Sequence, residues 1–230
     1  MSPYQALTLD MFGTVFDSGI GVLQDLSGRL VRELDLKVSP SEFFERWEGR
    51  FFSLVTPAAS FRTIDAANEE SLRMTLTDYG AVGRDPSSWL QETRTRWEQL
   101  EPFPEVREFL RAMEGFPICL LTNADDWLVE HLLRAHALTF DHVITSESRR
   151  LYKPDRRLFV DALEALGAPA GSTVHAGDSL RSDIDGARTA GMVTCWVNRS
   201  PRGRPPGELP PDFEVSNLEE LARLLRPDPE

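Results

Sequence analysis

Apolar residues recur along the chain in two patterns, and the change between them predicts how the chain is organised. Residues 5–10, QALTLD, form a short apolar run that predicts a strand. The next stretch has the spacing of a helix that is buried on one side, with apolar residues at 20, 23, 26, 30, 31 and 34. Further helical spacing follows within 41–55, 72–79 and 89–100. We therefore expect residues 18–100 to be entirely helical.

Two capping signals predict where helices begin. Ser39 precedes a proline and lies three residues before Glu42, a pattern typical of a serine that caps the first turn of a helix. Near the end of the chain, Ser216 and Glu219 have the same spacing and predict a capping box for a final helix.

The pattern changes after Pro102. Short apolar runs without polar alternation are separated by helical stretches, which predicts a parallel sheet covered on both faces. The expected strands are 117–123, 142–146, 172–178, 192–198 and a short last one at 213–216. We therefore predict an α/β fold, a doubly wound parallel sheet formed by residues 1–17 and 101–230, with the helical residues 18–100 inserted after the first strand.

Composition restricts the class of function. The chain has 230 residues, of which 41% are apolar and 27% charged, and a net charge of -12. These values indicate an ordinary soluble protein whose acidic surface repels nucleic acid. The first residues lack the basic and apolar regions of a signal peptide, and no apolar run reaches the roughly 18 residues of a membrane span. We therefore expect a cytoplasmic protein, monomeric or homodimeric, that binds a small molecule.

The two cysteines, Cys119 and Cys195, both lie in apolar runs that read as strands. A small buried side chain is a better interpretation of each than a disulfide partner or a metal ligand.

Polar residues stand at the ends of the predicted strands or in the loops that follow. In parallel α/β sheets, ligands bind at this edge. The residues are Asp10, Thr122 with Asn123, Lys153, and Asp178 with Asp183. Each of them alone is also typical of a turn, a helix cap or a solvated side chain. Their convergence at one edge of the sheet predicts a functional site.

The acidic members of this group suggest a metal site. A carboxylate at the end of a buried strand, as at Asp10, has a desolvation cost unless it is paired or binds a metal. Thr14 offers a hydroxyl that would orient this acid. Asp178 and Asp183 add oxygen ligands that suit a hard cation such as Mg²⁺.

The remaining members suggest anion binding. Thr122 and Asn123 offer a hydroxyl and backbone N–H groups to a phosphoryl or carboxylate oxygen, which makes them substrate-binding candidates together with Thr14. Lys153 would neutralise a nucleophile or an anionic transition state. His175 lies within a strand pattern and is expected to be a packed core residue rather than a catalyst.

Together, the motifs LTLDMFGTVFD, LLTN, YKPD and GDSLRSDIDGAR resemble those of the haloacid dehalogenase superfamily of hydrolases. The resemblance spans residues 5–17 and 103–198, and it implies that residues 18–100 are the small α-helical cap of that family. It implies that Asp10 is the nucleophile and forms a covalent ester. By the same resemblance, Thr122 binds the transferring group and Lys153 holds Asp10. The implied Mg²⁺ ligands are Asp10, Asp178, Asp183 and the backbone carbonyl of Phe12.

Phe12 departs from the pattern of the phosphatases in this family. They have an acid at this position that protonates the leaving alcohol, whereas the dehalogenating branch has an aromatic residue there. That branch, however, lacks an acid at the position of Asp178 and uses no metal. Three acids beside one lysine favour Mg²⁺ and an anionic phosphoryl substrate. We therefore expect a Mg²⁺-dependent phosphatase that acts on a small phosphorylated metabolite.

Two alternatives stay open. One is a 2-haloacid dehalogenase or another carbon–heteroatom hydrolase, in which Asp10 attacks carbon and Arg46 or Arg50 pairs with a substrate carboxylate. Arginines on a predicted helix are also typical of a solvent-facing surface. The other alternative is a non-catalytic binding protein on the same fold.

Overall fold

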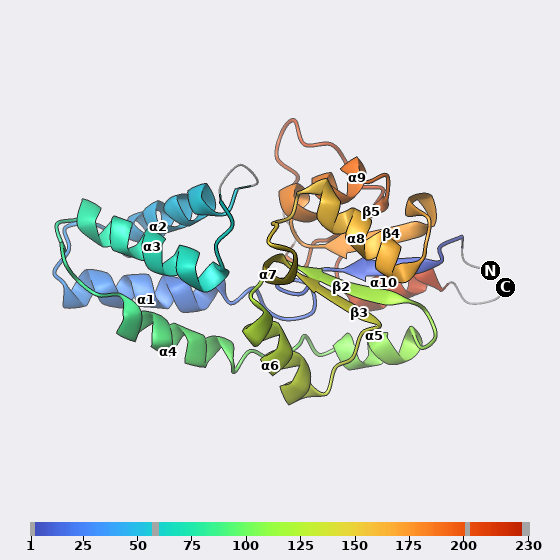
Figure 1. Cartoon of the computed structure of the whole chain (residues 1–230), viewed down its shortest axis with the longest axis horizontal. Helices are drawn as coiled ribbons and strands as arrows, with labels where there is room; N and C mark the ends of the chain where they lie inside the picture. Colours follow the sequence, from blue (N-terminus) through green and yellow to red (C-terminus); the bar gives the residue numbers. More distant parts are fainter. Residues whose placement is uncertain (1–2, 57–59, 201–202, 227–230) are drawn as a thin grey trace.

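The computed structural model describes residues 3–56, 60–200 and 203–226. Its sheet has six strands in the order β3-β2-β1-β4-β5-β6, and all neighbours are parallel. This arrangement confirms the predicted α/β fold (Figure 1). The strands are β1 (Ala6–Leu9), β2 (Ile118–Thr122), β3 (His142–Thr145), β4 (Thr173–Gly177), β5 (Val193–Val197) and β6 (Phe213–Val215).

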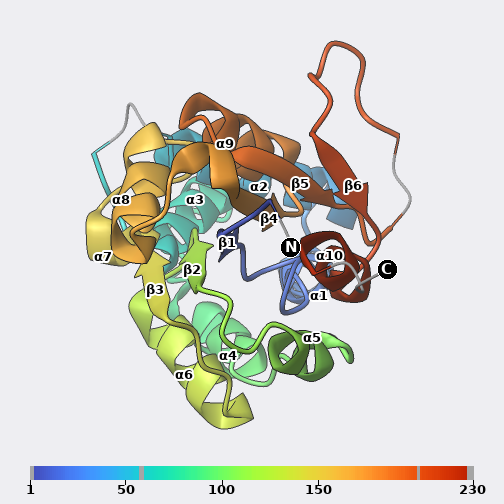
Figure 2. The same cartoon turned by 90° about the vertical axis from the view of Figure 1, so that its right-hand side faces the viewer.

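Helices cover both faces of the sheet, which explains why its strands lack polar alternation (Figure 2). Successive side chains of β2 illustrate this: Leu120 joins one apolar cluster, whereas Cys119 and Leu121 join another. Cys119 and Cys195 are buried free thiols, as predicted. The first cluster packs beneath α5 (Val106–Ala112), α6 (Asp126–His136) and α10 (Leu218–Leu225), and the second beneath α8 (Arg156–Leu166) and α9 (Gly186–Thr189).

Three short elements complete the part of the chain that surrounds the sheet. They are α7 (Ser146–Arg149), which follows β3, η1 (Ala170–Ser172), which precedes β4, and η2 (Leu180–Asp185), which follows β4.

Four helices form a separate group between β1 and β2, here called the helical block (Figure 1). They enclose an apolar cluster of their own that includes Leu30, Phe43, Trp47 and Leu72. Ser39 caps the second helix by accepting a hydrogen bond from Glu42 N, as the sequence predicted. Among the described residues, no helix has the length and apolar character that crossing a membrane requires. The block comprises α1 (Ile20–Glu33), α2 (Pro40–Leu54), α3 (Ile64–Asp78) and α4 (Ser87–Trp97).

The predicted capping box of the last helix is wrong by one residue. Asn217, and not Ser216, caps α10, because its side chain accepts a hydrogen bond of 3.0 Å from Glu220 N. Glu220 in turn accepts a bond of 2.7 Å from Ser216 N. Leu218 and Leu221 are fully buried, and burying both fixes the register of the helix, which places the cap at Asn217.

We predict that Asn217→Ala lowers the free energy of unfolding by about 1 kcal/mol, because the mutation removes the acceptor that caps the first turn. Ser216→Ala is the matched control and leaves that free energy almost unchanged, since the Ser216 side chain does not cap the helix. Urea denaturation of both variants measures the difference. Equal losses in the two variants would contradict the observed cap.

Candidate active site

The candidate site lies where three neighbouring strands end. Asp10 follows β1, Thr122 ends β2, and Asp178 follows β4. Because β1 is hydrogen-bonded to both β2 and β4, their carboxyl ends meet at one edge of the sheet. Asp10 is held there by its backbone, which donates a hydrogen bond of 2.9 Å to Ala176 O.

Lys153 lies at the centre of the site and is 4% exposed. Its Nζ is 2.6 Å from Asp10 Oδ1 and 2.6 Å from Asp183 Oδ1. It donates a third hydrogen bond, of 2.9 Å, to Leu121 O. All three donor positions of the ammonium group are therefore used, and two of them hold carboxylates.

Asn123 holds the lysine in place. Its side-chain Oδ1 accepts a hydrogen bond of 2.7 Å from Lys153 N, and its Nδ2 donates one of 3.1 Å to Lys153 O. The side chain predicted to bind substrate thus clamps the backbone of the lysine. This pairing joins the end of β2 to the loop before α8.

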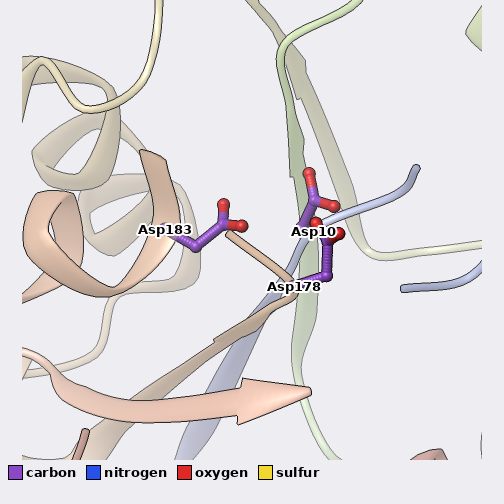
Figure 3. A group of neighbouring side chains, drawn as sticks. All are labelled: Asp10, Asp178 and Asp183. Atoms are coloured by element: carbon purple, nitrogen blue, oxygen red, sulfur yellow. The ribbon is translucent and has the colours of Figure 1, made fainter. Parts of the chain in front are cut away.

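Three carboxylates converge from different elements (Figure 3). Asp10, Asp178 and Asp183 each offer an oxygen that lies within 4.8 Å of the others. An all-oxygen, negatively charged set of this size fits a hard divalent cation. With Lys153 as their neighbour, three ionised carboxylates leave two negative charges in excess, which one such cation would balance.

Two glycines make room for these acids. A Cβ atom at Gly13 would lie 2.5 Å from Asp178 Cγ, and one at Gly177 would lie 2.3 Å from Asp183 Cγ. Gly13 also has φ of +88°, a conformation that residues with a side chain rarely adopt. The turn after β1 therefore requires glycine for two independent reasons.

The acids have unequal proton affinities. Burial, with the charges of Asp183 and Asp178, raises the pKa of Asp10 and outweighs the opposing effect of Lys153. Burial also acts to raise the pKa of Asp183, but Lys153 and His175 lower it well below its ordinary value. Asp183 is therefore the more firmly ionised of the two, and Asp10 gains most from an added cation.

His175 is fully buried in β4, as predicted, but it also contacts the site. Its Nε2 is 3.2 Å from Asp183 Oδ1, and its Nδ1 is 2.7 Å from Thr8 Oγ1. Burial lowers the pKa of His175, which favours the neutral ring. An ionised carboxylate only accepts, so Nε2 carries the proton and Thr8 donates to Nδ1. The sequence did not reveal this chain of bonds, because it depends on how β1, β4 and η2 pack together.

A cavity of about 330 Å³ opens above the acids, between the sheet edge and the helical block. Phe12, Thr122 and Lys153 are among its lining residues, together with side chains from α2 and α3. Thr14 is fully buried, and its hydroxyl has no hydrogen-bond partner within the described part of the chain.

The structure places Arg46 and Arg50 away from this cavity. Arg50 forms an ion pair with Asp78 on α3, and Arg46 Nε lies 4.0 Å from the same carboxylate. Neither arginine is among the lining residues. Asp78 therefore holds both side chains on the outer surface of the helical block.

Residues that the sequence did not single out connect the helical block to the sheet. Asp125, just after β2, accepts hydrogen bonds of 2.6 Å from Ile64 N and 2.9 Å from Asp65 N. Burial raises the pKa of this carboxyl to about 6. Trp127 Nε1 donates a bond of 3.0 Å to Asp65. A carboxylate from the sheet part of the chain therefore accepts the free N–H groups in the first turn of α3.

Arg199 supports the turn after β1, although its place in the sequence does not indicate this. Its guanidinium donates a hydrogen bond of 2.6 Å to Thr14 O and pairs with Glu105 at 2.7 Å. It also lies over the ring of Phe103, 3.6 Å from its centre. These contacts anchor the turn that presents Asp10.

Comparison with known proteins gives a consistent picture. Residues 4–191 match the model of the haloacid dehalogenase-like hydrolase family. The chain is 27% identical over 232 residues to an (S)-2-haloacid dehalogenase of Pseudomonas sp. strain YL, covering 98% of this chain and 96% of the relative. It is 29% identical over 233 residues to a phosphoserine phosphatase of Thermus thermophilus, covering 87% and 93%.

The fold is also that of solved structures. An L-2-haloacid dehalogenase from Xanthobacter autotrophicus superposes with a TM-score of 0.78 at 20% sequence identity, covering 98% of this chain and all of the other, 100%. At this identity the likeness concerns the fold, including the helical block between the first two strands.

We predict that Gly13→Ala lowers the free energy of unfolding by about 2–4 kcal/mol, through the cost of a left-handed residue and of a methyl group against Asp178. Gly80→Ala is the matched control, because φ there is +81° but nothing lies within 4 Å of the added Cβ. It is expected to cost about 1 kcal/mol. Chemical denaturation gives both values, and a Gly13 cost no larger than that at Gly80 would contradict the close approach.

Proposed function

The chain belongs to the haloacid dehalogenase-like hydrolases, and we propose that it cleaves a carbon–halogen bond, or a similar carbon–heteroatom bond, by attack of Asp10 on the carbon. The observation that carries the proposal is Phe12, which lines the cavity two residues after the nucleophile. A phenylalanine cannot protonate a leaving group, and a halide leaves without a proton. The dehalogenase relative that aligns over 98% of this chain supports the same chemistry.

In the proposed reaction, Asp10 Oδ forms a bond to the substrate carbon while the carbon–halogen bond breaks and the halide leaves with the electron pair. Water then attacks the carboxyl carbon of the resulting ester. The alcohol is released with one former oxygen of Asp10, and the oxygen of water replaces it in the carboxylate. One proton of the water neutralises the alkoxide and the other is released to solvent alongside the halide, so Asp10 returns to its ionised state.

The surrounding residues have distinct proposed parts. Lys153 orients Asp10 and stabilises the charge that develops on the ester carbonyl. Thr122 and the N–H groups after β2 would bind a carboxylate on the substrate, because Arg46 and Arg50 are engaged by Asp78. Residues 18–100 would act as a cap that keeps bulk water from the ester.

The geometry also favours a second candidate, hydrolysis of a phosphate monoester, which was the expectation from the fourth motif. The favouring observation is Asp178, a third carboxylate next to Asp10 and Asp183. In this candidate the three acids and the carbonyl of Phe12 would hold Mg²⁺, which would supply positive charge to a phosphoryl group. The comparisons include a phosphoserine phosphatase, but Phe12 leaves this chemistry without its proton donor.

We expect the purified protein to release chloride from 2-chloroacids of increasing chain length faster than phosphate from alkyl phosphates, each measured with and without Mg²⁺. Asp10→Asn is expected to lower turnover roughly 10³-fold or more while the protein stays folded. The reverse preference, for alkyl phosphates and only with Mg²⁺, would replace the first candidate by the second. A folded Asp10→Asn variant with normal turnover would exclude both.

We expect Mg²⁺ to bind even where the reaction does not need it. At a hundredfold excess over its Kd, a ligand of the native state contributes about 2.7 kcal/mol, which raises the Tm of a protein of this size by roughly 5–10 °C. Asp178→Asn removes one ligand and should reduce the shift. The control is Asp185→Asn, because Asp185 pairs with Arg188 and lies outside the group of three acids. A scanning fluorimetry experiment with no Mg²⁺ shift would exclude the metal site.

A further inference from the structure

The wall of the cavity that faces the acids is aromatic. The helical block contributes Phe44, Trp47, Phe51, Phe52 and Trp97 to the lining. Phe51 and Phe52 contact each other edge to face, with ring centres 5.6 Å apart. A cavity of about 330 Å³ with this lining is suited to an apolar body the size of an aromatic ring.

Two polar side chains interrupt this wall without a partner. Glu48 on α2 and Asn68 on α3 both line the cavity, and Asn68 is only 5% exposed. Within the described chain, neither side chain forms a hydrogen bond or an ion pair. The Asn68 amide is accessible from the cavity, so a ligand group placed there can take the hydrogen bonds that water would otherwise make with it.

The charge on Glu48 points to the kind of group. Burial, followed by the charge of Glu45, raises the pKa of the Glu48 carboxyl, so a hydrogen-bond donor would stabilise its ionised form. The third polar residue of the wall, Asp65, is already engaged by Trp127 at 3.0 Å and by Arg94 at 3.4 Å.

The helices that carry both side chains are held in place before any ligand binds. Asp125 holds the first turn of α3 at Ile64 and Asp65, and Asn68 lies one turn further on. Trp47, next to Glu48, donates a hydrogen bond of 2.9 Å to Ser71 Oγ, which ties α2 to α3. Glu48 presents acceptor oxygens only, and Asn68 presents an acceptor oxygen beside a donor nitrogen. Because the helices that carry them are already held, a ligand binds them with a smaller loss of conformational entropy.

The wall is unsuited to a second anion on the substrate. Among the described lining residues, Lys153 is the sole basic one, and its ammonium group is occupied by Asp10, Asp183 and Leu121 O. A second acidic group at the far end of a substrate would therefore meet Glu48 without a compensating cation.

We propose that Glu48 and Asn68 form a specificity subsite for a hydrogen-bond donor, a hydroxyl or ammonium group, carried by an apolar substrate body about the size of an aromatic ring. This rests on the proposed function only in taking the cavity as the substrate site. It predicts discrimination against 2-chloropropionate, which is too small to reach the wall, whatever bond Asp10 attacks.

The test measures the binding of probes that have no reacting group. The wild-type protein, with Mg²⁺ present, is titrated by NMR with 2-phenylethylamine, 2-phenylethanol and (2-methoxyethyl)benzene, which has no donor. The alcohol should bind about fivefold more tightly than the ether, and the amine tenfold or more, since a charge-assisted bond is the stronger. Equal affinities of the ether and both donors would overturn the proposal.

Variants identify the residues responsible. Glu48→Gln should reduce the preference for the amine to that for the alcohol, and Asn68→Ala should reduce the preference for the alcohol. The matched control is Glu45→Gln, the same charge change on an exposed neighbour outside the cavity, which should keep both preferences. An amine preference that survives in Glu48→Gln, or is lost equally in Glu45→Gln, would overturn the subsite.

The two proposals fail separately. A protein that hydrolyses neither chloroacids nor phosphates but still prefers the donor probes through Glu48 would reject the proposed reaction and keep the subsite. A protein that hydrolyses chloroacids but shows no donor preference would keep the reaction and reject the subsite.

Discussion

The site depends on the ion pairs that the buried ammonium group of Lys153 forms with two carboxylates. This group is 2.6 Å from both Asp10, which follows β1, and Asp183, which lies on η2. Without this cation the two carboxylates would be buried together, and leaving such a charge uncompensated costs on the order of 3–5 kcal/mol. The two hydrogen bonds from the Asn123 side chain to the Lys153 backbone therefore help to hold both carboxylates in place, because they position the lysine that pairs with them.

Asp178 adds a charge that Lys153 does not balance. The fold leaves space for this side chain only because residue 13 is glycine. A Cβ atom at Gly13 would lie 2.5 Å from Asp178 Cγ. This feature connects the chain to metal-dependent chemistry, whereas Phe12 connects it to reactions whose leaving group needs no proton. The site thus combines a cluster of three carboxylates, which suits a metal-dependent reaction, with an apolar residue, Phe12, where a proton donor would otherwise stand.

The sheet and the helical block contribute different residues to the site. The sheet supplies Asp10 and its charge partners, and the block supplies an aromatic wall with Glu48 and Asn68. Asp125 links the two parts, since it lies three residues after Thr122 and accepts two N–H groups at the start of α3. Because the link is made through backbone groups, the wall keeps its place over Asp10 independently of the side chains that line it.

The sequence by itself determined the α/β sheet, the helical block and the placement of the polar residues at strand ends or in the segments that follow them, namely Asp10, Thr122, Lys153, Asp178 and Asp183. These features depend on local periodicity and on turn residues, which neighbouring positions specify. Only the tertiary structure decided that Asn123 clamps Lys153, that His175 supports Asp183 and that Asp78 holds Arg46 and Arg50 away from the cavity. Each of these contacts joins residues from separate elements, and a side chain's partner there depends on packing between distant segments, which no local pattern encodes.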